Sequence, residues 1–441
     1  MKENQALVPA IFNDYYLQHK MSPRFIKLAE FKEQAWQNFI SIGLPHRKIE
    51  EWKYTALSHF EKLNFENKTE KDSSITIDSA LIDAHRVQGA KLIVFIDGVY
   101  SNDYSDTLDF PDHVMIKPIS ELLGADYQTL STLLERIEVN NNHMMAQLNC
   151  ALFEDGLLLS VPKNACIEEI QCLHISTGNT LSHYCHIVDL GENACATMIE
   201  TFVSVGESAG LTNSVTVGDL APGATLNHYK LSEEADSQQH IAGLFMSQAK
   251  NSFLRCHHAA LGGDLTRYDM DIKLRESGAH CLLDGIYIPT GRQHVDNHIL
   301  VEHLASHTTS EQHFKGVLDD KSHGVFNGKV IVHKDTSQIV AHQSNHNLLL
   351  SSKAEIDTKP ELEIYADDVK CSHGATVGQL DEKALFYLKS RGVAESEAKG
   401  LLTHAFVSDI IAKITAKNVH DRVEKVAKVK MNHAVMGFDE A

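Results

Sequence analysis

The residues best suited to chemistry are a cysteine and a histidine two positions apart, Cys371 and His373. They follow an alternating segment, residues 361–366, that predicts a β-strand, and two aspartates, Asp367 and Asp368, that interrupt it. In an extended chain, residues i and i+2 point to one face, so the thiol and the imidazole would lie side by side. Both are donors suited to iron, zinc or copper(I), but two ligands do not complete a metal site.

A second candidate lies in a histidine-rich region, since eleven of the 27 histidines fall between His280 and His373. His294, Asp296 and His298 alternate along one predicted strand and have the ligand types of an iron or zinc site. This pattern would suit a metal-dependent hydrolase or lyase. However, no HExxH motif is present and the histidines are spread over several predicted turns. Polar side chains that point outward and bind their neighbours are the favoured interpretation.

Composition excludes several functional classes. A formal net charge of −19 argues against a general nucleic-acid binder, which needs a basic face. The longest purely apolar run, residues 92–96, is too short to span a membrane, and residues 1–20 resemble neither a signal peptide nor an organelle import sequence. We therefore expect a cytoplasmic protein. The sequence has no GxSxG motif and no phosphate-binding loop, so any ATP hydrolysis must come from another subunit.

The cysteines are scattered and form no CxxC motif. A chain of 441 residues does not need disulfides for its stability, so we expect reduced and mostly buried thiols. The eight are Cys150, Cys166, Cys172, Cys185, Cys195, Cys256, Cys281 and Cys371.

The first 145 residues mix helices with a little sheet. Residues 22–42 predict an amphipathic helix with Ser22 as its cap and Pro23 in its first position. Residues 90–101 predict a strand, a turn at Asp97-Gly98 and a second strand, and residues 119–138 return to helical spacing. Between them, residues 50–55 (EEWKYT) are interpreted as a packing element of a helical domain.

From about residue 146 to residue 380, turns of small residues recur and each leads into a short strand. Repeated units of this kind favour a solenoid of stacked strands. A β-sandwich also has many short strands with turn signals, and periodicity alone leaves both folds open.

The last segment, residues 381–441, is helical. An apolar stripe at helical spacing needs a partner surface, most of it within the same domain; its members are Ala398, Leu401, Leu402, Ala405, Phe406 and Ile410. Residues 423–430 alternate apolar and charged residues, and they fit either a late strand or a docking segment.

Residues 357–402 resemble the SufD family, the scaffold subunit of the SUF iron–sulfur cluster assembly machinery. The matching motifs are PELEI at 360–364, DDVKCSHGAT at 367–376, FYL at 386–388 and SRG at 390–392. EEWKYT resembles a signature near the N-terminus of SufB and SufD proteins. The resemblance implies a mainly β fold, in which a right-handed parallel β-helix (146–380) is flanked by an N-terminal, mostly helical α/β domain (1–145) and a C-terminal helical domain (381–441).

The same resemblance implies a non-catalytic scaffold without nucleic-acid binding or a membrane span. It would pair with SufB through the end of the β-helix and dock the SufC ATPase, which binds the ATP, on its C-terminal helices. Isolated, it would hold no tight cofactor and could form a homodimer. In the complex, iron or a transient iron–sulfur cluster would lie at the SufB–SufD interface, with His373 as the main candidate ligand and Cys371 as the weaker one.

Three alternatives remain open. SufB is a structural relative, but SufB proteins are usually longer and carry extra cysteines, and the DDVKCSH motif ending at His373 favours SufD. A β-helix metalloenzyme would retain tightly bound metal when purified alone. A purely structural homodimer would use His373 for stability only.

Overall fold

The computed structural model describes residues 9–20, 26–57, 60, 76–111, 113–124, 126–135, 143–206 and 209–436. Before the central strands come α1 (Ala10–His19), α3 (Ala29–Ile42), the 3-10 helix η1 (Glu50–Trp52), α4 (Ser79–His85), β1 (Lys91–Ile96), β2 (Val99–Ser101), β3 (Met115–Pro118), α5 (Ile119–Leu122), α6 (Tyr127–Glu135) and α7 (Met144–Leu152). After them come α8 (Glu382–Ser390), α9 (Glu395–Ile411) and α10 (Lys417–Met436).

Between these flanks lies a long run of strands that are mostly 8–11 residues long. They are β4 (Leu157–Val161), β5 (Cys166–Ser176), β6 (Leu181–Leu190), β7 (Cys195–Ser204), β8 (Leu211–Leu220), β9 (Thr225–Ser232), β10 (Gln239–Gln248), β11 (Phe253–Ala260), β12 (Leu265–Leu274), β13 (His280–Tyr287), β14 (His294–His303), β15 (Thr309–Leu318), β16 (His323–Val332), β17 (Ile339–Leu349), β18 (Glu355–Ile364) and β19 (Val369–Gly378).

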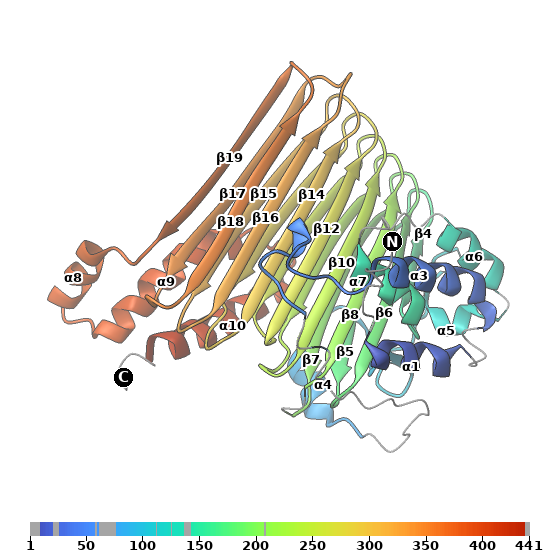
Figure 1. Cartoon of the computed structure of the whole chain (residues 1–441), viewed down its shortest axis with the longest axis horizontal. Helices are drawn as coiled ribbons and strands as arrows, with labels where there is room; N and C mark the ends of the chain where they lie inside the picture. The colour runs from blue at the N-terminus through green and yellow to red at the C-terminus, as the bar shows by residue number, and fades with distance from the viewer. Residues whose placement is uncertain are drawn as a thin grey trace, which may run out of the picture.

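Consecutive strands alternate between two sheets, so the chain winds as a β-solenoid (Figure 1). One sheet has ten strands in the order β19-β17-β15-β13-β11-β9-β7-β5-β1-β2, and the other has nine in the order β18-β16-β14-β12-β10-β8-β6-β4-β3. All pairings among β4–β19 are parallel. The expected solenoid is therefore confirmed, because a sandwich of antiparallel hairpins would pair consecutive strands.

The recurring turns have a common backbone conformation. Asn164, Asn193, Gly223, Asn251 and Gly278 all have positive φ, which asparagine and glycine tolerate best. Each turn also binds the next coil, since Asn193 N donates to Pro222 O at 2.9 Å and Gly223 N donates to Lys250 O at 2.8 Å. A Cβ on Gly223 would come within 2.3 Å of Asn193 Oδ1, so the stacking itself selects glycine there.

The solenoid encloses one main core made of the inward-facing residues of both sheets. In β13, for example, Cys281, Leu283 and Tyr287 alternate inward and are fully buried. This core extends from Ile93 of β1 to Ala354, just before β18. N-terminal residues thus contribute to the solenoid, because β1 pairs with β5 in parallel.

Helices cover the two outer faces. α7 packs over β6, β8 and β10 of the nine-stranded sheet, while α9 packs against β13 and β15 of the ten-stranded sheet (Figure 1). Within the described part of the chain, no helix is long and apolar enough to cross a membrane.

The local predictions had mixed outcomes. The hairpin with its turn at Asp97-Gly98 is confirmed, since β1 and β2 pair antiparallel around two residues of positive φ. The helix expected over 22–42 includes α3, which starts only at Ala29; Ser22 and Pro23 lie outside the described residues. The single helical segment expected over 119–138 is two helices, α5 and α6, separated near Gly124.

The strand alternative for residues 423–430 is wrong, because they belong to helix α10. Val419, Val423, Ala427 and Met431 recur every four residues and are buried against the ten-stranded sheet and α9. The alternation within eight residues was too short to distinguish a strand from one face of a helix.

Candidate functional site at the open end of the solenoid

The solenoid ends in two strands that each have a neighbour on one side only. β18 pairs with β16 and β19 pairs with β17, and among the described residues no further strand pairs with either. Both are ten residues long and largely exposed or half-exposed. Pro360 within β18 fits an edge position, because proline lacks the N–H that an inner strand needs. The outer edges therefore present backbone groups that another chain could pair with.

Cys371 and His373 lie on β19 and point to the same side, as their spacing predicted. In the register of the sheet, Cys371 stacks on Ala341 and His373 stacks on Gln343, two buried residues that face the solenoid interior. Among the described residues no further coil stacks on β18 and β19, which form the end of the solenoid (Figure 1). The two side chains therefore belong to the exposed end of the core.

The two candidate ligands differ in their surroundings. Cys371 is half-buried against the main core, and burial raises the pKa of its thiol. His373 is exposed, and its ring has no hydrogen-bond or ion-pair partner in the part of the chain that the structure describes. His373 is therefore the more exposed donor of the two, whereas burial disfavours the thiolate form that Cys371 would need to bind a metal.

These two donors do not form a closed metal site. The described residues contain no group of three or more histidine, cysteine, aspartate or glutamate side chains arranged to hold a metal ion. Cys371 and His373 by themselves leave the coordination of a metal incomplete.

His294, Asp296 and His298 do share the outer face of β14, but each forms a hydrogen bond or an ion pair with a neighbouring side chain. Asp296 Oδ2 accepts from Arg267 at 2.6 Å, and Asp296 Oδ1 lies 3.0 Å from His298 Nε2. Burial would raise the pKa of Asp296, but His298 and Arg267 hold it well below its ordinary value. The carboxylate is therefore part of a buried ion-pair network.

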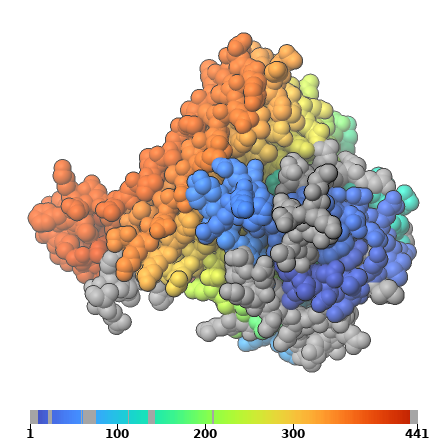
Figure 2. Space-filling model, in the orientation of Figure 1, coloured from blue at the N-terminus to red at the C-terminus, as the bar shows by residue number. Residues whose placement is uncertain are grey.

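The EEWKYT segment covers this network. Arg267 lies 3.6 Å from the Trp52 ring and donates to Glu51 O at 2.9 Å, while Thr55 hydrogen-bonds His294 at 2.8 Å. Lys359 of β18 binds Glu50 at 2.9 Å. In the space-filling view, a blue N-terminal segment lies directly against the orange strands of the solenoid (Figure 2). The segment packs against the N-terminal helices, as expected, but it also fastens them to the solenoid. Sequence reasoning missed this second contact because its partners are more than 200 residues away.

Sequence reasoning also missed a group of charged residues inside the solenoid. Glu200 Oε1 lies 2.7 Å from His228 Nε2, and Glu200 Oε2 lies 3.4 Å from Lys230 Nζ. All three side chains are fully buried. The available signal was a charged residue at an inward-facing position of its strand, as with Glu200 in β7 and Lys230 in β9.

The apolar stripe of α9 is divided between the interior and the surface. Ile410 is buried against the solenoid, Leu402 and Phe406 are half-buried, and Leu401 and Ala405 are exposed. The preceding α8 has no buried residue, and its Phe386 is 72% exposed. α8 projects away from the solenoid (Figure 1). Part of the expected docking surface is thus available to a partner, although Ile410 is not.

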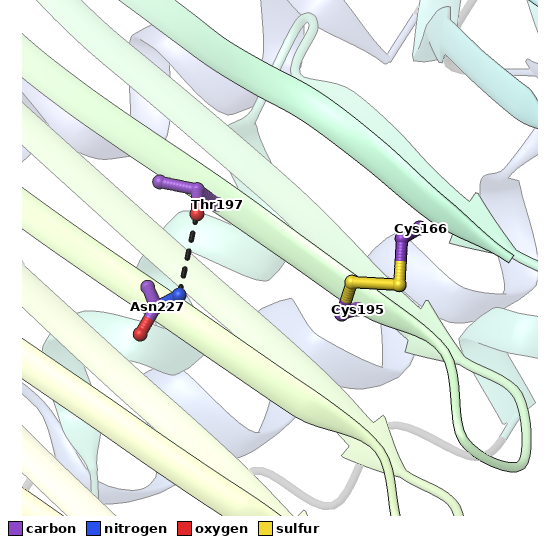
Figure 3. The surroundings of a disulfide bond; sticks show 4 residues. All are labelled: Cys166, Cys195, Thr197 and Asn227. Carbon is purple, nitrogen blue, oxygen red and sulfur yellow. Dashed lines mark hydrogen bonds between the residues drawn. A yellow bond between two sulfur atoms is a disulfide. The ribbon is translucent and has the colours of Figure 1, made fainter. Parts of the chain in front are cut away.

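The expectation that all cysteines are reduced is wrong for two of them. Cys166 of β5 and Cys195 of β7 form a disulfide between neighbouring coils (Figure 3). Their spacing of 29 residues is the length of one coil, which brings them into lateral register. The other cysteines are free and, apart from half-buried Cys371, they are buried.

Comparisons with known proteins agree with this architecture. Residues 173–406 match the family model described as "SUF system FeS cluster assembly, SufBD core domain", and residues 11–175 match the "SufBD protein N-terminal region". The chain is 30% identical over 394 residues to the iron–sulfur cluster assembly protein SufD of Escherichia coli, covering 89% of this chain and 90% of that protein.

Two further relatives extend the similarity. A SufBD family protein of Synechocystis is 29% identical over 399 residues, with 87% of each chain covered. SufD of Bacillus subtilis is 24% identical over 308 residues, covering 66% of this chain and 68% of that protein. Because the similarity spans both the N-terminal region and the solenoid, the chain belongs to the SufD family of SUF iron–sulfur cluster assembly proteins.

Proposed function

We propose that this chain is a non-catalytic scaffold subunit that pairs with a SufB-like subunit through the open end of its solenoid and carries a SufC-like ATPase on its C-terminal helices. The observation that carries the first part is the open end, where β18 and β19 leave one edge unpaired and His373 lies exposed at the mouth of the core. A partner that adds strands there would shield these edges from water.

The nascent iron–sulfur cluster is the cargo of such a scaffold. His373 would supply one ligand and the partner would supply the thiolates, which accounts for the incomplete donor set on this chain. Cys371 is the weaker candidate because burial raises the pKa of its thiol. Isolated, the chain would contain far less than one iron per molecule, whereas a metalloenzyme would retain its metal.

The ATPase would bind the exposed part of the C-terminal helices. Phe386 and Leu401 are 72% and 51% exposed, and large apolar side chains that remain exposed on neighbouring helices are typical of a docking surface. The sequence lacks a phosphate-binding loop of its own, so ATP would be bound and hydrolysed by that partner.

The test is anaerobic reconstitution of the chain with SufB-like and SufC-like subunits, in which bound iron and sulfide are measured together with the mass of the complex. We expect His373→Ala to assemble normally and to lose most of the cluster. His342→Ala is the matched control, since His342 is also exposed but lies on the outer face of the neighbouring strand β17 and binds Ser372. A full cluster in the His373→Ala complex would show that His373 is not a ligand and that the role of this chain is structural.

A dependence on pH follows from the same assignment. An imidazole binds iron only when it is neutral, and protons compete for thiolates as well, so reconstitution at pH 6 should give less cluster than at pH 8. The complex must be shown to be intact at both values by its mass. Equal yields at the two pH values would contradict the ligand assignment.

A further inference from the structure

The Cys166–Cys195 disulfide occupies an unusual position among the cysteines of this chain. Cys166 is exposed and Cys195 is half-buried on the outer face of the ten-stranded sheet (Figure 3). By contrast, Cys150, Cys172, Cys185, Cys256 and Cys281 are all buried, and burial raises the pKa of each thiol. Cys166 and Cys195 are therefore the pair that dissolved thiols can reach.

The disulfide joins two coils that are already held together by other contacts. Asn193 Nδ2 donates to Asn164 Oδ1 at 3.1 Å, and Lys163 pairs with Glu192 at 2.7 Å. In the backbone, Cys195 N donates to Ala165 O at 2.9 Å. After a register shift between Cys166 and Glu169, β5 and β7 pair in parallel over eight further residue pairs. The coils would remain stacked after the S–S bond is broken.

Backbone register keeps the two sulfurs close in either redox state. The Cα atoms of the pair are 4.5 Å apart because Cys166 and Cys195 are direct lateral neighbours in the sheet. A reduced pair at this spacing can close again without movement of the backbone. The packing of the main core does not depend on the S–S bond. Ala194 and Ala196, which flank Cys195 in the sequence, are themselves buried in that core.

We propose that Cys166 and Cys195 form a reversible thiol–disulfide exchange site on the surface of the solenoid, which accepts two electrons from a dithiol reductant. A thiolate of the reductant attacks the exposed Cys166 sulfur, the S–S bond breaks, and Cys195 leaves as a thiolate. The second thiol of the reductant then attacks the mixed disulfide and releases Cys166. The products are two protein thiols and the oxidised, cyclic disulfide of the reductant. This site does not depend on the ligand role proposed for His373.

The test uses the full chain without denaturant. The oxidised protein is equilibrated with mixtures of reduced and oxidised dithiothreitol, the free thiols are alkylated, and the labelled cysteines are identified by peptide mass. We expect two newly labelled thiols, at positions 166 and 195, unchanged far-ultraviolet circular dichroism, and recovery of the bond in the oxidised buffer. Reduction that occurs only in denaturant would overturn the proposal, as would a protein treated with diamide that lacks the 166–195 bridge.

Single variants test the order of attack. Cys195→Ser leaves the exposed Cys166, which should form a mixed disulfide with oxidised glutathione at least tenfold faster than Cys195 does in Cys166→Ser. Cys371→Ser is the matched control, because Cys371 is the other cysteine that is not fully buried, and this variant should retain the bridge. Equal rates for the two single variants would overturn the assignment of Cys166 as the attacked sulfur.

Discussion

At the scale of single residues, the charged group inside the solenoid shows how the fold stabilises ions in an apolar core. Lys230 pairs with Glu200 and lies 3.6 Å from the Phe202 ring, while Thr216 donates to Glu200 at 2.6 Å. Burial would raise the pKa of Glu200, but Lys230 and His228 hold it well below its ordinary value. Removal of Lys230 or of Glu200 would therefore leave the opposite charge buried without its ion-pair partner.

Removal of one partner should be costly. We expect Lys230→Met to lower the free energy of unfolding by about 3–5 kcal/mol, because it leaves the buried carboxylate of Glu200 without its lysine partner. The double variant Lys230→Met with Glu200→Gln should recover a large part of this loss. Urea unfolding followed by circular dichroism measures both values.

A surface pair gives the matched control for this prediction. Lys163 and Glu192 also join neighbouring coils, at 2.7 Å, but both are exposed. Lys163→Met should therefore cost less than about 1 kcal/mol. Equal losses for the buried and the exposed lysine would show that burial does not set the strength of these pairs.

At the scale of elements, α9 serves two purposes because its faces have different partners. Ile410 and Val407 pack on the solenoid, while Leu401 remains 51% exposed. Lys315 of β15 fixes the last turns of the helix, since it donates to Phe406 O at 2.8 Å and pairs with Asp409 at 2.7 Å. The exposed face is therefore presented by a rigidly attached helix.

Leu401→Glu should weaken binding of a SufC-like subunit at least tenfold with little change in thermal stability, because the side chain lies at the surface. Leu17→Glu on α1 is the control, since Leu17 has a similar exposure of 54% and lies outside the C-terminal helices. Calorimetric titration measures binding and differential scanning measures stability. If Leu401→Glu binds as tightly as the wild type, the docking surface does not include the Leu401 face of α9.

At the scale of the whole molecule, buried neutral histidines connect stability to pH. Burial lowers the pKa of His186, His257 and His303 to about 4. In the unfolded chain these groups have ordinary values near 6.5, so between about pH 6.5 and pH 4 the unfolded chain binds more protons. Their contribution to stability is complete above about pH 6.5 and is lost as the pH falls.

We therefore expect the free energy of unfolding to decrease from pH 7 to pH 5, by up to about 1.4 kcal/mol per pH unit for each such histidine. Glu200 acts in the same direction at lower pH, since its pKa is depressed in the fold. Urea unfolding across this range measures the slope. His257→Gln should flatten the slope, whereas exposed His342→Gln should not; a constant free energy from pH 7 to pH 5 would contradict this account.

Much of the architecture could be predicted from local patterns. The recurring turns and the alternation within strands predicted many short strands between two helical regions, because each depends on interactions within a few residues. They favoured a solenoid but left a β-sandwich open, and the resemblance to the SufD family decided between the two folds. The i, i+2 spacing also placed Cys371 and His373 on one face of β19, since side chains alternate in any strand.

Only the tertiary structure decided features that depend on register between coils. The Cys166–Cys195 bond, the buried group around Glu200 and the contact of Trp52 with Arg267 each join residues 28 or more positions apart. Their pairing depends on the exact length of every intervening coil, which composition and periodicity do not specify. The sequence by itself therefore determined which elements form and where His373 lies on its strand. The stacking of the coils decided which side chains meet and that the strand of His373 lies at an open edge.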